Sequence, residues 1–319
     1  MKIIYMGTPE IAAVILEDLV SAGYDIAAVV TQPDKPRGRG KELGCSEVKE
    51  TALAHGLAVY QPERVKEEAF LDELKRLKPD LIVVAAFGQL LPKQILELPK
   101  YGCINVHASL LPKYRGASPI QWAILDGERV TGVTIMYMAE GLDTGDMITK
   151  ELVEIAPDET GGSLHDKLAG AGCIALRRAI GQIEGGTAVR TPQDNTQATY
   201  VGMLKKEMGY LDFSRPAVEL ERRVRGLNPW PSAYTGLDGR LLKLWRCEVC
   251  GEPSAQVKQR IREEKWECGT VVETGRDFFS VLTGDGLLVV RELQLEGKRR
   301  MSAEEFLRGC PLKAGEVLK

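Results

Sequence analysis

The sequence predicts an open α/β sheet followed by a smaller β-rich domain, and three observations support this prediction. Strand-like apolar runs alternate with helical stretches over residues 1–183, which is the order of a mostly parallel sheet. Residues 185–200 are poor in large aliphatic side chains and rich in Gly, Thr, Gln and Asn, as linkers are. Short β-like runs with Gly turns follow, and they favour a small barrel or sandwich.

The first domain opens with a β-α-β unit, formed by a strand at 2–7, a helix at 11–23 and a strand at 24–31. The turn after the first strand holds Gly7 but no GxGxxG, which argues against NAD binding. The further elements expected are a helix near 46–55, a strand at 57–61, a charged helix near 66–77, strands within 79–88 and 102–109, a helix at 118–127, paired strands at 131–138 and 147–155, and a helix at 162–183.

The linker-like composition of residues 185–200 indicates where the domain boundaries lie. We expect a catalytic domain over 1–186, a linker over 187–206 and a C-terminal domain over 207–319. The expected elements of the C-terminal domain are a helix at 215–227, short strands at 241–247, 269–274, 278–284 and 286–294, and a closing helix at 302–309.

Charge and hydropathy exclude several classes of protein. The 319 residues carry a formal net charge of −3, which argues against a general nucleic-acid binder, although residues 201–319 have a small basic excess that suits a polyanion. The longest apolar run, LIVVAAF, is far shorter than the ~20 residues of a membrane span. The start MKIIYMGTPE lacks the sections of a signal peptide. A cytoplasmic protein without membrane contact is therefore expected.

The cysteines do not indicate a disulfide framework or a metal site. They number seven and are scattered, so reduced thiols are expected. Cys247 and Cys250 form one CxxC, but a structural zinc site needs a second pair of ligands, and no His follows His165. We therefore expect no metal.

Polar side chains follow the predicted strand at 102–109, where a ligand site is expected in an open α/β sheet. Asn105 and His107 share one face of that strand because side chains alternate along it, and Ser109 comes next. Asp143 lies in a later loop between Gly141 and Gly145. An Asp that reached His107 would orient the imidazole and favour its charged form.

Spacing alone leaves two interpretations open for this cluster. One is catalytic, with Asn105 donating a hydrogen bond to a developing oxyanion and His107 paired with Asp143. The other is structural, because a His after a strand is usually a satisfied structural residue and an Asp between glycines is usually a turn former.

The run NVHASLLPKYRGASPIQWAILDGERVTGVTIMYMAEGLDTGDM, residues 105–147, resembles the core of the folate-dependent formyltransferases. The shared motifs are Asn-x-His, Ser-Leu-Leu-Pro, Arg-Gly and Leu-Asp-Thr-Gly. The resemblance implies a Rossmann-like sheet that transfers a formyl group from 10-formyltetrahydrofolate, as co-substrate, to an amine without a metal. It implies that Asn105, His107 and Asp143 are catalytic.

The resemblance also implies which residues contact the folate. The Ser-Leu-Leu-Pro segment matches the family's folate-contacting loop, and the run AAFGQLL at 85–91 resembles the wall around the pterin ring. From the residues alone the two leucines of the loop would be packing residues. The folate-binding residues expected are Ser109, Leu110, Leu111, Pro112, Phe87, Gly88 and Leu90.

The amine acceptor is indicated by TQPDKPRGRGKELG, residues 31–44, which resembles the basic loop of the family members that act on methionyl-tRNA. Arg37, Arg39 and Lys41 place three cations on this glycine-rich loop, where they suit the phosphates of an acceptor stem. The resemblance implies that Arg39 enters the end of the tRNA. From composition alone, a solvated surface loop is the alternative. Residues 45–47, Cys-Ser-Glu, depart from the Pro-Ser-Pro common in these members, which could alter the anchoring of the loop.

The stretch at 194–234 resembles the linker and first helix of the C-terminal domain in the same members, an oligonucleotide-binding-like β-barrel that holds tRNA. The resemblance implies an enzyme that formylates initiator methionyl-tRNA for translation initiation, and we expect a monomer. Two alternatives stay open, a formyltransferase for an amino sugar nucleotide and a non-catalytic folate- or RNA-binding relative. The candidate phosphate contacts here are Lys205, Lys206, Arg222, Arg223 and Arg225.

Overall fold

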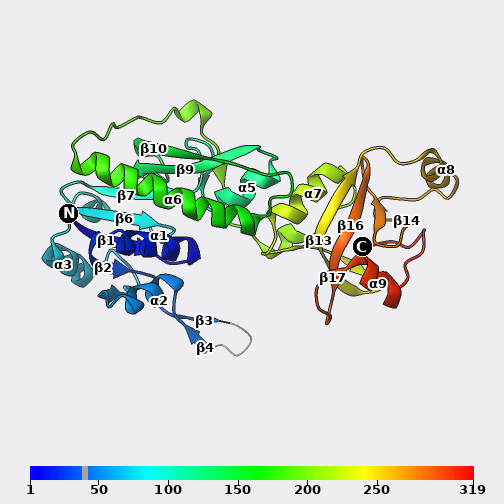
Figure 1. The fold of residues 1–319 in the computed structure, drawn as a ribbon, viewed down its shortest axis with the longest axis horizontal. Coiled ribbons are helices and arrows are strands. Elements are labelled where there is room, and N and C mark those ends of the chain that lie inside the picture. Colours follow the sequence, from blue (N-terminus) through cyan, green and yellow to red (C-terminus); the bar gives the residue numbers. More distant parts are fainter. Residues whose placement is uncertain (38–41) are drawn as a thin grey trace. The chain divides into compact units, whose positions relative to one another are not determined.

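The computed structural model describes residues 1–37 and 42–319, and it describes side chains outside residues 36–43 (Figure 1). The chain forms two compact units. The first comprises Met1–Pro119, Arg129–Glu154 and Leu164–Gly202, and the second comprises Ile120–Glu128, Ile155–Ser163 and Met203–Lys319. Within the described residues, no helix is both long enough and apolar enough to cross a membrane.

The first unit is built on a seven-stranded sheet of order β10-β9-β7-β6-β1-β2-β5. The pairs β1–β2, β1–β6, β6–β7 and β2–β5 are parallel, while β9 pairs with β7 and β10 in antiparallel fashion. The prediction of an open, mostly parallel sheet is confirmed. The strands are β1 (Lys2–Gly7), β2 (Asp25–Val30), β5 (Val59–Tyr60), β6 (Leu81–Ala85), β7 (Cys103–His107), β9 (Val130–Tyr137) and β10 (Met147–Glu154).

The helices α1, α2, α3, α5 and α6 of the N-terminal half coincide with the predicted ones to within a few residues, whereas the single turn α4 follows no long apolar period and was not predicted. The bounds are α1 (Glu10–Ser21), α2 (Glu47–Ala54), α3 (Glu68–Leu77), α4 (Lys93–Leu96), α5 (Pro119–Leu125) and α6 (Gly161–Glu184).

Alternation along the central strands supplies the core on both faces of the sheet. Ile4 and Met6 of β1 pack in one cluster with Phe70 and Leu74 of α3, as side chains two apart on a strand should. On α6, Gly172 lies against Ile15 of α1 and against Val106 of β7. Each fully buried aliphatic side chain in such a core contributes ~1.5–3 kcal/mol, so the sheet is a rigid support for the residues at its strand ends.

Two short pairings in the first unit were not predicted. Strands β3 (Lys35–Arg37) and β4 (Glu42–Gly44) form an antiparallel hairpin, and β8 (Arg115–Gly116) pairs in parallel with β11 (Tyr200–Val201). These strands are two or three residues long, too short for a hydrophobic period to reveal them.

The second unit contains an antiparallel sheet of order β12-β13-β16-β15-β14, with β17 on β16. The prediction of a small β-rich C-terminal domain is confirmed, and β12 and the polar helix α8 were missed. Its core includes Leu244, Phe279, Val290 and Leu293. The elements are η2 (Lys206–Gly209), α7 (Ala217–Gly226), β12 (Ala233–Leu237), β13 (Arg240–Cys250), α8 (Ala255–Glu263), β14 (Val271–Thr274), β15 (Phe279–Leu282), β16 (Leu287–Leu295), β17 (Met301–Ser302) and α9 (Ala303–Gly309).

Candidate active site

Asn105 and His107 lie on β7, between β6 and β9 in the sheet. They share a face of the strand, as the sequence predicts. His107 is 6% exposed and Asn105 is half-buried. In the described part of the chain, the Asn105 amide has no protein hydrogen-bond partner. Its amide is therefore available to a substrate atom.

The hydrogen bonds of His107 distinguish its two ring nitrogens. Nε2 lies 2.9 Å from the carbonyl oxygen of Tyr114, and because a carbonyl only accepts, Nε2 carries a proton. Nδ1 lies 3.7 Å from Oδ2 of Asp143, which is too long for a direct hydrogen bond. Nδ1 is therefore the ring nitrogen that can exchange a proton with a substrate beside the Asp143 carboxylate.

Asp143 reaches this position because its loop makes a close turn after β9. Its φ is 51°, a left-handed conformation that Asp tolerates better than most residues. A Cβ at Gly145 would overlap the carbonyl of Tyr137, so the loop needs glycine there. The backbone N–H of Gly116 donates to Asp143 Oδ2 at 2.8 Å. The structure thus brings His107 and Asp143 together.

The loop after β7 is held by hydrogen bonds. The Ser109 hydroxyl donates to the carbonyl of Lys113 at 2.7 Å. Thr134 of β9 donates to the carbonyl of Ser109 at 2.7 Å and accepts from the N–H of Leu111 at 3.1 Å. Leu111 is buried against Met136 and Met147. Ser109 and Leu111 therefore face the protein interior, while Leu110 and Pro112 are half-buried.

The loop after β6 contains the other predicted folate residues. Phe87 is buried, and its carbonyl accepts from Thr8 at 3.2 Å and from Gln32 at 3.1 Å. Gly88 has a φ of +85°. Leu90 is 75% exposed. Of these three, Leu90 is the one whose side chain is open to a ligand.

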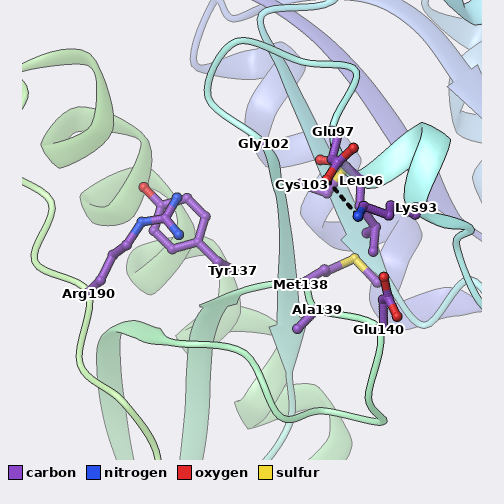
Figure 2. A pocket seen from close by; sticks show the side chains of 10 residues that line it. All are labelled: Lys93, Leu96, Glu97, Gly102, Cys103, Tyr137, Met138, Ala139, Glu140 and Arg190. Atoms are coloured by element: carbon purple, nitrogen blue, oxygen red, sulfur yellow. Dashed lines mark hydrogen bonds and ion pairs between the residues drawn. The ribbon is translucent and has the colours of Figure 1, made fainter.

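A pocket of about 250 Å³ lies next to this region, and Figure 2 shows the side chains that line it. It is bounded by α4, which follows the loop after β6, and by residues 138–140 of the loop that carries Asp143. Arg190 stacks over the ring of Tyr137, 3.8 Å from its centroid. None of the predicted folate residues lines the pocket. The lining residues are Lys93, Leu96, Glu97, Gly102, Cys103, Tyr137, Met138, Ala139, Glu140 and Arg190.

Two ionisable groups near the site are shifted by burial. Burial raises the pKa of the Cys103 thiol to about 12, so this pocket residue is a neutral thiol at pH 7 and not a nucleophile. Burial also lowers the pKa of Lys150, whose ammonium donates to the carbonyl of Leu111 at 2.5 Å. Lys150 therefore fixes the Ser-Leu-Leu-Pro loop.

The basic loop predicted to enter tRNA belongs to the β3–β4 hairpin. Arg37 ends β3, whereas Arg39 and Lys41 lie outside the described residues. The base of the hairpin is anchored at Asp34, which accepts from Lys49 at 2.6 Å and from Gln61 at 2.7 Å. Both bonds lower the pKa of Asp34, and the bond from Lys49 has the larger effect.

Residues 45–47, where Cys-Ser-Glu replaces the common Pro-Ser-Pro, still form a regular start for helix α2. Ser46 accepts from the N–H of Lys49 at 3.1 Å and caps α2. Its hydroxyl also lies 2.7 Å from that of the buried Thr31. Ser46, which this chain shares with the common Pro-Ser-Pro pattern, therefore joins the start of α2 to the residue that follows β2.

The predicted tRNA-binding residues of the second unit differ in availability. Lys205 and Lys206 are exposed, and Arg222 is half-buried with its guanidinium against Gly127. Arg223 donates to the carbonyl of Met208 at 2.6 Å, and Arg225 donates to that of Glu159 at 2.8 Å. Arg223 and Arg225 are thus occupied by bonds within the protein.

The buried arginine of the shared Arg-Gly motif joins the site to the segment predicted as a linker. Arg115 is 1% exposed. Its guanidinium donates to Gln193 at 2.8 and 3.1 Å, to Asn195 at 2.8 Å and to the hydroxyl of Tyr200 at 2.9 Å. Gln193 was missed, because polar residues in a stretch poor in large aliphatic side chains give no hydrophobic pattern.

In the described ranges 1–37 and 42–319, no group of three or more His, Cys, Asp and Glu side chains is placed to hold a metal ion. Cys247 and Cys250 are three residues apart on β13 and point to opposite faces of the strand. Burial raises the pKa of Cys247, which opposes formation of the thiolate that a metal needs.

Comparisons with known proteins identify both parts of the chain. A family model described as "Formyl transferase" matches residues 1–180, and "Formyl transferase, C-terminal domain" matches residues 203–311. The methionyl-tRNA formyltransferase of Lachnospira eligens is 52% identical over 318 residues, covering 100% of this chain and 99% of the relative. That of Clostridioides difficile is 47% identical and covers 100% of both chains.

Solved structures share the fold at low identity. The sugar 3N-formyl transferase WlaRD, crystallised in the presence of dTDP and 5-N-formyl-THF, has a TM-score of 0.66 at 20% identity and covers 94% of this chain and 99% of its own. Phosphoribosylglycinamide formyltransferase from Anaplasma phagocytophilum has a TM-score of 0.51 at 19% identity and covers 63% of this chain and 98% of its own. The chain therefore belongs to the formyl transferase family, within which the methionyl-tRNA formyltransferases match its full length.

Proposed function

We propose that this protein transfers the formyl group of 10-formyltetrahydrofolate to the α-amino group of methionine on initiator methionyl-tRNA. The observation that carries the reaction type is that Asn105, whose amide has no hydrogen-bond partner among the described residues, shares a face of β7 with His107, whose Nδ1 faces Asp143. The relatives that are 45–52% identical over the whole chain carry the name methionyl-tRNA formyltransferase, which supports this acceptor.

The chemistry follows from the groups at the end of β7. The amine lone pair attacks the formyl carbon, a new C–N bond forms, and the carbonyl oxygen gains negative charge. The Asn105 amide and a protonated Nδ1 of His107 donate to this oxyanion, at ~3 kcal/mol per well-placed donor. The oxyanion then re-forms the C=O bond as the bond to the folate nitrogen breaks, and the electron pair of that bond stays on the folate nitrogen, which takes up the proton of His107 Nδ1. The attacking nitrogen, positively charged since the new C–N bond formed, releases one proton, which returns His107 to its charged form.

The attacking amine needs little assistance to lose its proton. An α-amino group has an ordinary pKa of ~7.7–8, so a substantial fraction is neutral near pH 7. The carboxylate of Asp143 stabilises the positive imidazole across 3.7 Å, and its own charge is stabilised by the N–H of Gly116. The protein's main contribution is therefore preorganised charge stabilisation.

The folate is proposed to lie between the loop after β6 and the loop that carries Asp143. The exposed Leu90 and the half-buried Leu110 provide apolar contact there. The 250 Å³ pocket adjoins both loops through α4 and residues 138–140, so we assign part of the folate to it. Ser109 and Leu111 act by shaping the loop, because both are buried.

The tRNA is proposed to meet two basic regions. Arg37, Arg39 and Lys41 on the β3–β4 hairpin approach its acceptor end, and Lys205, Lys206 and Arg222 contact its phosphates. Both assignments rest on the positive charge of these side chains, which suits a polyanion. The setting is the cytoplasm, where translation begins, and the working form is a monomer.

An acceptor panel tests the proposal. The purified protein is incubated with 10-formyltetrahydrofolate and, separately, with methionine-charged initiator tRNA, an amino sugar nucleotide and glycinamide ribonucleotide, and the formylated product is measured by mass spectrometry. We expect formylation of the tRNA-bound methionine. Formylation of the sugar nucleotide alone would establish the alternative that the low-identity structural neighbours represent.

A further inference from the structure

Residues 191–201, a segment predicted to be a plain linker, pack against the active site within the first unit. Thr191 forms a bridge with Met147 at the start of β10. Thr199 accepts from the N–H of Tyr114 at 2.8 Å through its hydroxyl and from the N–H of Arg115 at 2.8 Å through its carbonyl. The carbonyl of Tyr114 in turn binds His107. The segment therefore supports the backbone that fixes the imidazole.

Gln193 connects the same segment to the other half of the catalytic pair. Its amide nitrogen donates at 2.8 Å to the carbonyl oxygens of both Asp143 and Gly145. Its amide oxygen accepts two bonds from Arg115, at 2.8 and 3.1 Å. Carbonyls can only accept and a guanidinium can only donate, so the amide can satisfy all four bonds in one orientation only.

The partners of Gln193 flank the catalytic carboxylate on both sides. The loop around Asp143 turns through a left-handed residue and a glycine, and between β9 and β10 it belongs to no helix or strand. Two of its carbonyls share one donor, and its carboxylate accepts from Gly116, which is paired in β8 with the same segment. Loss of the Gln193 donor would free the loop while the carboxylate remained chemically intact.

We propose that Gln193 is a positioning residue for formyl transfer, which sets the distance between Asp143 and His107 through the backbone of the Asp143 loop, with Arg115 as its buried support. This inference rests on the proposed function, because the rate of formyl transfer is its readout. Gln193 touches no reacting atom. A displacement of about 1 Å at a catalytic group can cost on the order of 10²-fold in rate, so an effect of 10- to 100-fold on kcat is expected.

The substitution Gln193→Glu keeps the hydrogen-bond acceptor of this side chain and removes its donor, so the two roles can be tested separately. A carboxylate still accepts from Arg115, and as an ion pair it does so more strongly. It cannot donate, however, and it places negative charge against the carbonyls of Asp143 and Gly145. If Gln193 served only to satisfy Arg115, the variant would keep its activity. A matched control is Gln197→Met, since Gln197 is exposed on the same segment and, among the described residues, its amide bonds to Asp194 alone.

The experiment measures steady-state methionyl-tRNA formylation by the full chain in a double-mutant cycle with Asp143→Asn. We expect Gln193→Glu to lower kcat by 10- to 100-fold with less than about threefold change in either KM, and Gln197→Met to behave as wild type. In the Asp143→Asn background, the further loss from Gln193→Glu should be less than about threefold, because both changes disable the same carboxylate.

Unchanged kcat in Gln193→Glu, or an equal loss in both backgrounds, would overturn the inference. If Gln193→Glu does not fold, as judged by circular dichroism, Gln193→Met is similar in size, lacks the donor, and enters the same cycle with the same expected and overturning results. Failure of the wild-type protein to formylate methionyl-tRNA would instead refute the proposed function, so the two failures are distinguishable.

Discussion

Arg115→Met removes a buried positive charge whose partners are all neutral. The guanidinium is 1% exposed and makes four hydrogen bonds to Gln193, Asn195 and Tyr200. Among the described residues it has no carboxylate partner within ion-pair distance. Methionine has a similar reach and fills the same space without donors. The variant therefore tests how much the polar network contributes to the first unit.

The expected loss of stability depends on how exposed the hydrogen-bond acceptors of Arg115 are. Hydrogen bonds to a charged group contribute ~1.5–3 kcal/mol each when the acceptor is otherwise unsatisfied. Tyr200 is 63% exposed and Asn195 is exposed, so water can replace the arginine there. The half-buried Gln193 oxygen loses two bonds at once. We therefore expect a net loss of about 2–4 kcal/mol, which corresponds to a fall in Tm of roughly 4–16 °C for a unit of this size.

The assay combines differential scanning calorimetry with tryptophan fluorescence. All four tryptophans, at positions 122, 230, 245 and 266, belong to the second unit, so their fluorescence reports that unit while calorimetry reports both. We expect the calorimetric transition of the first unit to fall, with a smaller change in the fluorescence transition. A calorimetric Tm within 1 °C of wild type would refute the reasoning that the Arg115 network stabilises the fold.

Four further predictions concern the chemistry, the hairpin, a buried thiol and a strand contact. Asn105→Ala should lower kcat by about 10²-fold with little change in tRNA affinity, because one oxyanion donor is lost, and normal turnover would exclude that role. Arg39→Ala should raise KM for tRNA more than KM for folate, whereas equal changes would assign the hairpin to the fold alone. Because burial raises the pKa of Cys103 to about 12, its thiolate fraction at pH 8 is about 10⁻⁴. Mass spectrometry after treatment with iodoacetamide should therefore find the exposed Cys268 modified first. Early labelling of Cys103 would contradict its burial. Gly116→Ala places a Cβ 2.5 Å from a carbonyl of β11 at a φ of +102°, so urea unfolding should show a loss of about 2 kcal/mol or more, and an unchanged midpoint would mean that β11 moves freely.

The main sheet was predictable because its strands are buried and apolar. Leu81–Ala85 of β6 is buried at every position, and β9 pairs with β10 as an antiparallel ribbon. In such segments the hydrophobic pattern and the secondary structure have the same cause. The same pattern places Asn105 and His107 directly after apolar strand residues, which is why they were candidates before their geometry was known.

The geometry of the site was not predictable in the same way. The 3.7 Å between His107 and Asp143 depends on a turn through Gly145 and on the N–H of Gly116, neither of which leaves a periodic pattern. The carbonyl of Tyr114 binds Nε2 of His107, and this contact determines that Nδ1 is the ring nitrogen left to face a substrate. These contacts join residues far apart in the sequence, so only the folded backbone shows them.

The segment around Gln193 shows that amino-acid composition alone does not distinguish a linker from a packed segment. Its polar residues are typical of a linker, yet residues 191–201 pair with β8 and β10 through backbone hydrogen bonds and bind Arg115 through side-chain amides. A segment held by hydrogen bonds rather than by apolar burial looks disordered in a hydrophobic profile. The hairpin of β3 and β4 was not predicted because its strands are three residues long, too short for a hydrophobic period.

The most direct measurement of the central claim is single-turnover formylation of methionine-charged initiator tRNA by the wild-type chain and by His107→Ala, with excess enzyme and 10-formyltetrahydrofolate. The account predicts conversion of the tRNA-bound methionine to formylmethionine by wild type, and a rate about 10²-fold or more lower for the variant. No formylmethionine from the wild type, or equal rates for the two proteins, would contradict it.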